Sequence, residues 1–290
     1  MRGASVSAGR EAAADRHVAV VFSTDAEWAG HLVAFVGRGL DRGEQVRYFA
    51  DSTDPGRVLR TLTDHGVDAP SAVRRGQLVV TPAAGTCLAG PRFDPDAMIG
   101  LWHGAVEAAA ARGHRGLRAI GEMSWGARGV AGAERLMEYE LRIHHEVIDR
   151  LPLTAWCFYD RRLLPRDDPR VLTAAHLTRR GTAGDDRAPG LSAAPLTDRP
   201  GVRLSGSAGY EGRRVTASAA AALTASPARE VTLDLSDLDH LDIAALAGIA
   251  RAAARRTSGT PVRVLGAPPA LTRMLELFPE LGRGLEVGDR

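Results

Sequence analysis

The stretch LDLSDLDHLDIAALAGIARAAARR, from Leu233 to Arg256, changes its character at Asp242. Before Asp242, apolar and polar residues alternate, as in a half-buried strand, and after it the sequence is typical of a helix. Asp242 stands where an N-cap is expected, because its carboxylate can accept hydrogen bonds from the N–H groups of a first helical turn. The stretch therefore predicts a strand, a short turn and a helix.

The same alternation extends on both sides of this stretch. GVRLSG from Gly201 and PVRVLG from Pro261 read as strands, and Glu211 to Ala225 reads as an Ala-rich helix. A last helix follows in PPALTRMLELF, whose two leading prolines suit a helix N-terminus. Residues 201–290 are thus predicted to form a small α/β domain of their own.

Upstream of this domain, residues 180–200 are rich in Gly, Pro, Asp and Ala and hold almost no large apolar side chain. Such a segment lacks the material for a core, so we predict a flexible linker. Residues 1–15 have no apolar core of a signal peptide, and we expect a disordered tail.

Residues 16–179 alternate short apolar runs with amphipathic stretches, which indicates a parallel sheet covered by helices. We expect strands in HVAVVFS, QVRYFA, QLVVTP, GLRAIGE and TAWCFYD, and helices at Glu27–Gly39, Asp54–His65, Asp94–Arg112 and Glu134–Arg150. Right-handed crossovers would then give a three-layer α/β/α sandwich. The predicted fold class is α/β, with a larger sandwich and a smaller second domain.

Composition excludes several classes of protein. The net charge is +2, and all 37 basic residues are arginine, so no excess charge points to nucleic acid or a membrane surface. Cys87 and Cys157 lack metal-type spacing, and no apolar run approaches the roughly 20 residues of a membrane span. We expect a cytoplasmic protein.

The C-terminal domain resembles a STAS domain, the fold of anti-sigma-factor antagonists. The resemblance is carried by VRLSG, by VTLDLSDLDHLDIAALAGIARAA and by PVRVLGAPPALTRMLEL. In that family an acidic residue at the turn precedes Ser-Ser/Thr-Gly-Leu. Asp242 and Leu246 match, whereas Ile243, Ala244 and Ala245 replace the hydroxyl pair and the glycine.

The resemblance implies a protein partner, such as an anti-sigma factor or a related regulatory kinase, at Asp242, Ile243, Ala244 and Ala245. In the family a phosphate at this turn breaks the interface, and these side chains cannot accept one. Constitutive partner binding, a docking or dimerisation role, and a turn that merely packs the helix on the sheet all stay open. A homo-oligomer stays open as well.

The N-terminal domain resembles a MEDS domain, a sensory module of methanogen and methylotroph regulators. The resemblance is carried by GLRAIGEMSWGARGVAGAERLMEYELRIH, HVAVVFSTDAEW, FVGRGLDRGEQVRYF and AWCFYDRRLLP. It implies a small organic ligand, and it suggests kinship with RecA-like ATPase cores. The turn after the first strand, FSTDAEWAGHL, carries acidic Asp25 and Glu27 instead of a phosphate-binding loop, so we do not expect ATP hydrolysis.

Ligands of open α/β sheets bind outside the carboxyl ends of the strands. The candidate ligand-binding residues on that basis are His17, Ser23, Asp25, Glu27, Trp28, Glu122, Met123, Trp125, Glu138, Tyr139, Cys157 and Tyr159. Trp28 and Met137 also fall at helical positions typical of a core. Glu138 and Glu140, two residues apart, are not expected to point inward together.

No catalytic residues or metal ligands are predicted, and the sequence names no cofactor. GxSxG, HExxH and paired-cysteine motifs are missing from the sequence, and the spacing of His17, His103, His176 and Cys157 does not indicate a metal or haem site. The alternative to a regulator is a degenerate RecA-like ATPase or other enzyme with an appended STAS domain. Glu122, at a strand end, would then be its general base.

Overall fold

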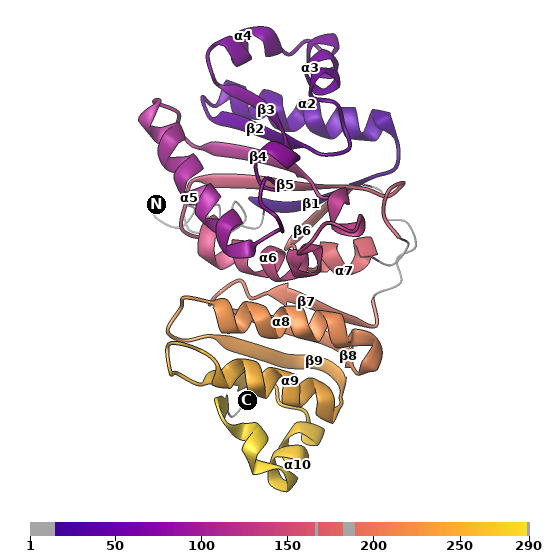
Figure 1. Cartoon of the computed structure of the whole chain (residues 1–290), viewed down its shortest axis with the longest axis vertical. Coiled ribbons are helices and arrows are strands. Elements are labelled where there is room, and N and C mark those ends of the chain that lie inside the picture. The colour runs from indigo at the N-terminus through magenta and orange to yellow at the C-terminus, as the bar shows by residue number, and fades with distance from the viewer. Residues whose placement is uncertain (1–14, 166–167, 182–188, 289–290) are drawn as a thin grey trace, which may run out of the picture. The chain divides into compact units, whose positions relative to one another are not determined.

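The computed structural model describes residues 15–165, 168–181 and 189–288 (Figure 1). The chain divides into two compact units, and each is described by itself. The first unit comprises Met1–Leu136, Val147–Pro169 and Leu177–Asp186, and the second comprises Met137–Glu146, Arg170–His176 and Arg187–Arg290. The predicted tail, apart from Asp15, lies outside the described residues, as does the 182–188 part of the predicted linker.

The first unit is built on a parallel six-stranded sheet in the order β3-β2-β4-β5-β1-β6. Its strands are β1 His17–Phe22, β2 Gln45–Ala50, β3 Leu78–Pro82, β4 Leu117–Glu122, β5 Leu153–Asp160 and β6 Thr178–Gly181. All six residues of β1 are buried, which is expected of a central parallel strand with both faces covered.

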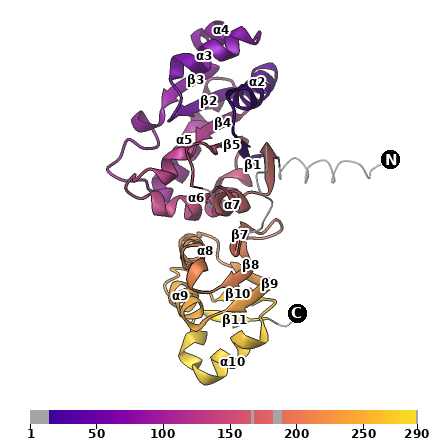
Figure 2. The same cartoon turned by 90° about the vertical axis from the view of Figure 1, so that its right-hand side faces the viewer.

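Helices cover both faces of this sheet. They are α2 Asp25–Asp41, α3 Pro55–Asp64, α4 Ala69–Arg74 and α5 Pro95–Ala111. Neighbouring residues of a strand point to opposite faces: Tyr48 packs in one core cluster with α2 and α3, whereas the Phe49 ring contacts Trp102 of α5. Figure 2 shows α2 and α5 on opposite sides of the strands. The predicted α/β class is confirmed.

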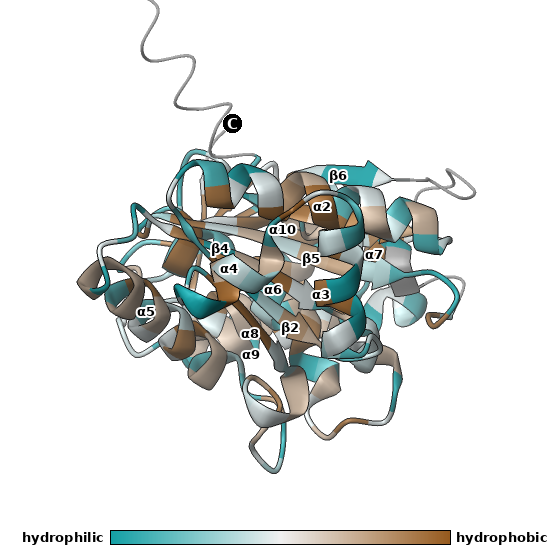
Figure 3. Cartoon of the chain, turned by 90° about the horizontal axis from the view of Figure 1, so that it is seen from above, coloured by the Kyte–Doolittle hydropathy of each residue, from teal (hydrophilic) through white to brown (hydrophobic). Residues whose placement is uncertain are grey.

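Strand β6 was not predicted from the sequence. It reads TRRG, and its residues are exposed or half-buried, so it lacks the apolar alternation by which strands are recognised. It lies at the edge of the sheet and pairs only with β1, and Figure 3 shows it as a hydrophilic strand. Charged residues are common on edge strands, where they discourage pairing with other chains.

The second unit is a smaller α/β structure on a five-stranded sheet in the order β11-β10-β9-β8-β7. Its strands are β7 Leu191–Pro195, β8 Gly201–Ala208, β9 Thr232–Leu241, β10 Val262–Leu265 and β11 Leu285–Val287, and its helices include α8 Arg213–Ala225, α9 Ile243–Ala254 and α10 Pro269–Leu277. Helices α8 and α9 lie on the same side of this sheet (Figure 2).

Strand β7 corrects the prediction of a linker over residues 180–200. Residues 191–195 pair antiparallel with β8, and Leu191, Ala193 and Pro195 are buried in alternation. This strand was not predicted because most side chains of its sequence, LSAAP, are small. Its proline stands at the end of an edge strand, where a missing N–H is tolerated.

The core of the second unit includes two segments that precede residue 180. Met137 and Leu141 from α6 Leu136–Ile143, and Ala175 after α7 Asp168–Ala174, belong to one apolar cluster with the strands and helices of this unit. The predicted helix Glu134–Arg150 is interrupted, since a five-residue π-helix, His144–Ile148, follows α6. The expected core role of Met137 is confirmed.

Candidate functional site

The carboxyl ends of β1, β2, β4 and β5 meet at one edge of the first sheet, because the four strands are parallel. We call this the carboxyl edge. Three sequence-predicted residues reach it directly, namely Ser23 after β1, Glu122 at the end of β4 and Tyr159 near the end of β5. The edge is therefore the predicted location for a ligand of this unit.

Glu122 anchors the loop that follows β2. Its side chain is buried, with 3% of the residue exposed, and Oε2 accepts hydrogen bonds from three successive main-chain N–H groups, of Asp51 (2.8 Å), Ser52 (2.7 Å) and Thr53 (3.0 Å). The Ser52 hydroxyl adds a fourth bond at 3.1 Å. The carboxylate thus fills a concave array of N–H groups of the kind that binds anions.

The second oxygen of Glu122 is held by Tyr48. The Tyr48 hydroxyl donates to Oε1 at 2.5 Å and accepts from the Trp28 Nε1–H at 3.0 Å. Burial, reinforced by the Glu122 charge, raises the pKa of Tyr48 well above its ordinary value. The phenol stays protonated at neutral pH, so it remains a donor to the carboxylate.

The loop after β1 is closed in a similar way by Glu27. Thr24 is the N-cap of α2, and the Glu27 carboxylate accepts from the main-chain N–H groups of Ser23 (2.7 Å) and Thr24 (3.2 Å) in a capping box. The loops after β1 and β2, whose main-chain N–H groups could cradle a phosphate, each already hold a carboxylate of the chain. This arrangement disfavours a triphosphate at the carboxyl edge.

Asp25 lies on the exposed side of the same turn. Its carboxylate pairs with Arg57 at 2.7 Å and with Arg162 at 2.9 Å, and hydrogen bonds from Arg162 and Arg57 lower the pKa of Asp25. Arg57 also lies over the Trp28 ring. Trp28 itself is buried in the core of the first unit, which confirms its expected core role.

The remaining candidates of the first unit are buried. Met123 and Trp125 follow Glu122, and the Trp125 ring packs at 4.7 Å between centroids on Phe93. His17 and Cys157 lie on the neighbouring strands β1 and β5, where Ala155 is opposite His17, and His17 Nε2 is 3.8 Å from Cys157 Sγ. The structure thus brings this predicted pair together at the beginning of β1, away from its carboxyl end.

Glu138 and Tyr139 group with the second unit, not with the carboxyl-edge residues of the first. Arg142 lies between Glu138 (3.2 Å) and Glu146 (2.8 Å), and all three side chains are largely buried. Glu140 is also buried and faces His176 at 3.4 Å. The expectation that only one of Glu138 and Glu140 points inward is wrong, because each glutamate has a buried cationic or imidazole partner on its own side of α6.

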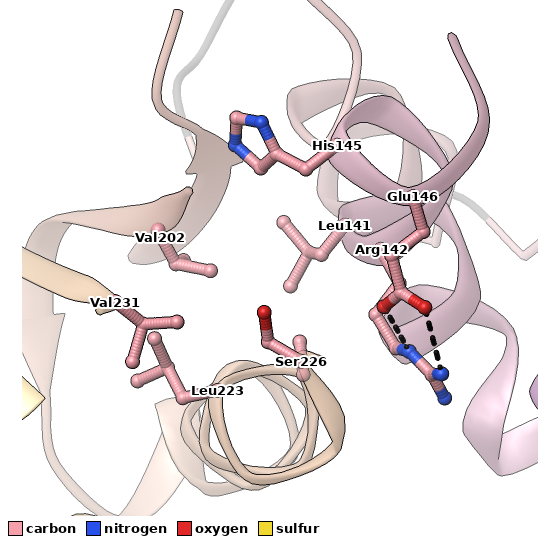
Figure 4. A pocket seen from close by; sticks show the side chains of 10 residues that line it. Leu141, Arg142, His145, Glu146, Val202, Leu223, Ser226 and Val231 are labelled. Atoms are coloured by element: carbon pink, nitrogen blue, oxygen red, sulfur yellow. Dashed lines mark hydrogen bonds and ion pairs between the residues drawn. The ribbon is translucent and has the colours of Figure 1, made fainter. Parts of the chain in front are cut away.

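A small cavity of about 20 Å³ opens beside α6 within the second unit (Figure 4). Leu141 and His145 face Val202, Leu223 and Val231 across it. This volume accommodates about one water molecule. It is too small to hold the organic ligand expected of a sensor.

The turn quoted at the start of the sequence analysis has the predicted geometry. Asp242 is the N-cap of α9, and its Oδ1 accepts the Ala245 N–H at 2.7 Å. Ile243 is 45% exposed and Ala244 is exposed, whereas Ala245 is buried against the sheet. Two of the four predicted partner-binding residues therefore face solvent in the first turn of the helix.

Sequence reasoning missed Tyr210, which is 71% exposed beside this turn. Tyr210 follows β8 and Ile243 follows β9, and these neighbouring parallel strands end together, with Ala208 opposite Leu241. Arg213 lies over the Tyr210 ring at 4.1 Å. The signal available in the sequence was an aromatic residue placed in a glycine-flanked loop, GYEG, where no core requires it.

Sequence reasoning also missed Asp51 and Arg128 at the carboxyl edge of the first unit. The two side chains form an ion pair, with Asp51 7% and Arg128 53% exposed. Asp51 comes directly after the strand QVRYFA, so its position at a strand end was the available signal.

Comparison with known proteins identifies both parts of the chain. The protein belongs to the family described as the methanogen/methylotroph, DcmR sensory domain (MEDS), which it matches over residues 16–177. Residues 194–279 match the family described as Mlab, STAS domain. The predicted order of a MEDS domain followed by a STAS domain is confirmed.

One relative is the transcriptional repressor DcmR of Methylorubrum extorquens, which is 25% identical over 158 residues. The match covers 54% of this chain and 56% of that protein, so the chain spans only about half the length of the relative. Together with the two domain families, this similarity indicates a regulatory or signalling protein. Within the described residues, no helix is both long and apolar enough to cross a bilayer.

Proposed function

We propose that this chain is a non-enzymatic signalling protein of the cytoplasm. Its MEDS domain binds a small organic molecule, and its STAS domain binds a regulatory protein such as an anti-sigma factor or a related kinase. Ligand binding, in place of serine phosphorylation, is the input. An effect on transcription would follow, in keeping with the relative that is named a transcriptional repressor.

The exposed turn surface of the second unit supports the protein partner. We define this surface as Tyr210, Ile243 and Ala244, which lie together at the ends of β8 and β9. An exposed aromatic and an exposed branched aliphatic side chain are favourable anchors for a protein interface. This cluster, at the turn that the STAS resemblance marks, is the single observation that carries the proposal.

The chemistry of the turn supports control without phosphorylation. Ile243, Ala244 and Ala245 carry no hydroxyl, so a kinase has no acceptor at these positions. In a serine-bearing turn, a phosphate would add between one and two negative charges to the interface. In our proposal, ligand binding takes the place of phosphorylation in setting the partner-binding state of this turn.

The carboxyl edge of the first unit supports a ligand other than a nucleotide. Glu27 and Glu122 occupy the main-chain N–H groups of the loops after β1 and β2. The chain also holds no lysine, the residue that a phosphate-binding loop places on the phosphates. Ligand control requires different affinities for two conformations, since a ligand that binds both equally shifts nothing.

Partner capture with Ala244→Glu tests this proposal. A glutamate at the first turn of α9 introduces the missing negative charge, and the helix dipole favours it there by about 0.3–1 kcal/mol, so the fold is not weakened. We expect wild-type protein to capture purified anti-sigma factors of its own cell, and Ala244→Glu to lose that capture.

Ala254→Glu is the matched control. It places the same charge at the exposed last residue of the same helix. Retained capture by Ala254→Glu and lost capture by Ala244→Glu would support the surface. Equal capture by all three proteins would refute it.

A further inference from the structure

Asp51 has a buried carboxylate oxygen that the rest of the site does not satisfy. The residue follows β2 at the carboxyl edge, and its side chain is 7% exposed. Oδ1 pairs with Arg128, but Oδ2 is buried and has no hydrogen-bond partner among the described residues. Buried charged oxygens are rarely left without a hydrogen-bond partner, because each missing hydrogen bond lowers the stability of the fold.

The loop cannot give Asp51 Oδ2 a partner by changing its backbone conformation. The main-chain N–H groups of Asp51, Ser52 and Thr53 all donate to Glu122, so the backbone that carries the carboxylate is held at three successive positions. These N–H groups are also not available to Oδ2. The unsatisfied oxygen is therefore a feature built into the loop.

The local charge favours a cation. Glu122, at the end of β4, places its carboxylate against the loop that carries Asp51. The cation in contact with Asp51, Arg128, is 53% exposed and partly screened by water. Burial, together with the charge of Glu122, raises the pKa of Asp51 even though Arg128 acts against it. A positively charged hydrogen-bond donor would supply both the missing bond and the missing charge.

Arg128, the partner of Asp51 Oδ1, has an exposed side chain. It lies between the short helices Ser124–Ala127 and Ala133–Arg135, in a segment with left-handed glycines at Gly129 and Gly132. Because its guanidinium is exposed, it can leave the carboxylate without opening the core.

We propose that Asp51 is the recognition group of the sensory domain and that the ligand carries a small primary ammonium group, which donates a hydrogen bond to Asp51 Oδ2. This inference rests on the proposed sensing function and adds the chemical class of its ligand. Sequence-predicted Glu122 then acts as the positioning residue for the loop, without touching the ligand.

Ethylammonium chloride is the probe, titrated into the full-length protein at constant ionic strength and followed by saturation-transfer NMR of the ethyl protons. We expect saturable binding to wild type that is weakened about tenfold or more by Asp51→Asn, since a hydrogen bond to a charged group is lost. Arg128→Gln should bind ethylammonium more tightly than wild type, because it removes the competing cation.

Asp68→Asn is the control. It makes the same chemical change at the exposed N-cap of α4, and we expect unchanged affinity. The affinity for ethylammonium should fall in Asp51→Asn and rise in Arg128→Gln. These opposite changes separate loss of ligand recognition from damage to the fold. No saturable binding to wild type, or equal affinity in Asp51→Asn, overturns the inference.

The outcome also separates this inference from the sensing function. If native mass spectrometry finds a retained molecule without an ammonium group, and Asp51→Asn still retains it, sensing stands and the role of Asp51 is refuted. If neither a retained molecule nor ethylammonium binding is found, both proposals fail.

Discussion

Glu122→Gln is the substitution that most sharply separates an anchoring role from a catalytic one. The change keeps the size of the side chain and removes its charge. Five hydrogen bonds end on this carboxylate: three from main-chain N–H groups, one from the Ser52 hydroxyl and one from the Tyr48 hydroxyl. In the variant the amide oxygen can still accept, but the amide nitrogen faces the Tyr48 hydroxyl.

The expected loss of stability follows from these bonds. A hydrogen bond to a charged group contributes about 1.5–3 kcal/mol and a neutral one about 0.5–1.5 kcal/mol, so each bond weakens by about 1 kcal/mol. Four of the five bonds share one oxygen, and the neutral amide costs less to bury than the carboxylate, so the bonds do not add fully. We predict that Glu122→Gln lowers the free energy of unfolding of the first unit by about 2–4 kcal/mol.

Tryptophan fluorescence in urea measures this loss selectively. All four tryptophans lie in the first unit, so their emission follows its unfolding, and they are Trp28, Trp102, Trp125 and Trp156. With a urea m value of about 1–3 kcal/mol/M, a loss of about 2–4 kcal/mol lowers the midpoint by about 0.7–4 M. Amide hydrogen exchange of Asp51, Ser52 and Thr53 should accelerate in parallel, because these amides lose their charged acceptor.

Two results would refute the anchoring role of Glu122. The first is an unfolding midpoint within experimental scatter of wild type together with unchanged protection of the three amides. The second is measurable ATP turnover by wild-type protein that disappears in Glu122→Gln without loss of stability. That second pattern would identify Glu122 as a general base and favour the degenerate ATPase.

Four further predictions test other contacts of the structure. The raised pKa of Asp51 means that the folded state binds more protons than the unfolded state above pH 3.8, so wild type should lose stability relative to Asp51→Asn as the pH rises through that range. The pH dependence at Asp25 has the opposite sign. Because the pKa of Asp25 is lowered, Asp25→Asn should destabilise the protein above pH 3.8, and this loss of stability should disappear as the pH falls below that value. Urea titrations at several pH values measure both effects. Tyr48→Phe should cost about 1–3 kcal/mol by the fluorescence assay, because it leaves the buried Trp28 N–H without its acceptor; an unchanged midpoint would contradict this. Leu141→Ala should destabilise the second unit by about 2–5 kcal/mol, seen by calorimetry as a lower transition temperature while the tryptophan transition stays in place; a shift of the tryptophan transition alone would show that Leu141 belongs to another core.

The parts of the fold that the sequence predicted are those with strong local signals. The apolar runs of β1, β2, β4 and β5 predicted buried parallel strands. Asp242 was predicted to cap the helix from its position just before it, and it is the N-cap of α9. Strands β6, β7 and β11 were missed because they are short and lie at or near sheet edges, so their residues need little apolar character.

The candidate site was predictable only in part, for a related reason. Glu122 was found because a carboxylate at a strand end stands out in the sequence. Its partners are Tyr48 in β2 and Asp51 and Ser52 in the loop after β2, about 70 residues away, and no local sequence pattern predicts that contact. Tyr210 was missed because the exposure of its side chain to solvent depends on how the chain packs, and the local sequence does not show this.

Partner binding by the STAS domain without a serine switch can be measured in one titration. An anti-sigma factor with kinase activity is titrated calorimetrically into the full-length protein, with and without prior incubation with Mg-ATP. We expect the same dissociation constant in both titrations and no phosphate on residues 242–246 by mass spectrometry. A partner affinity that falls after incubation with ATP, together with a phosphorylated side chain beside the turn, would contradict it.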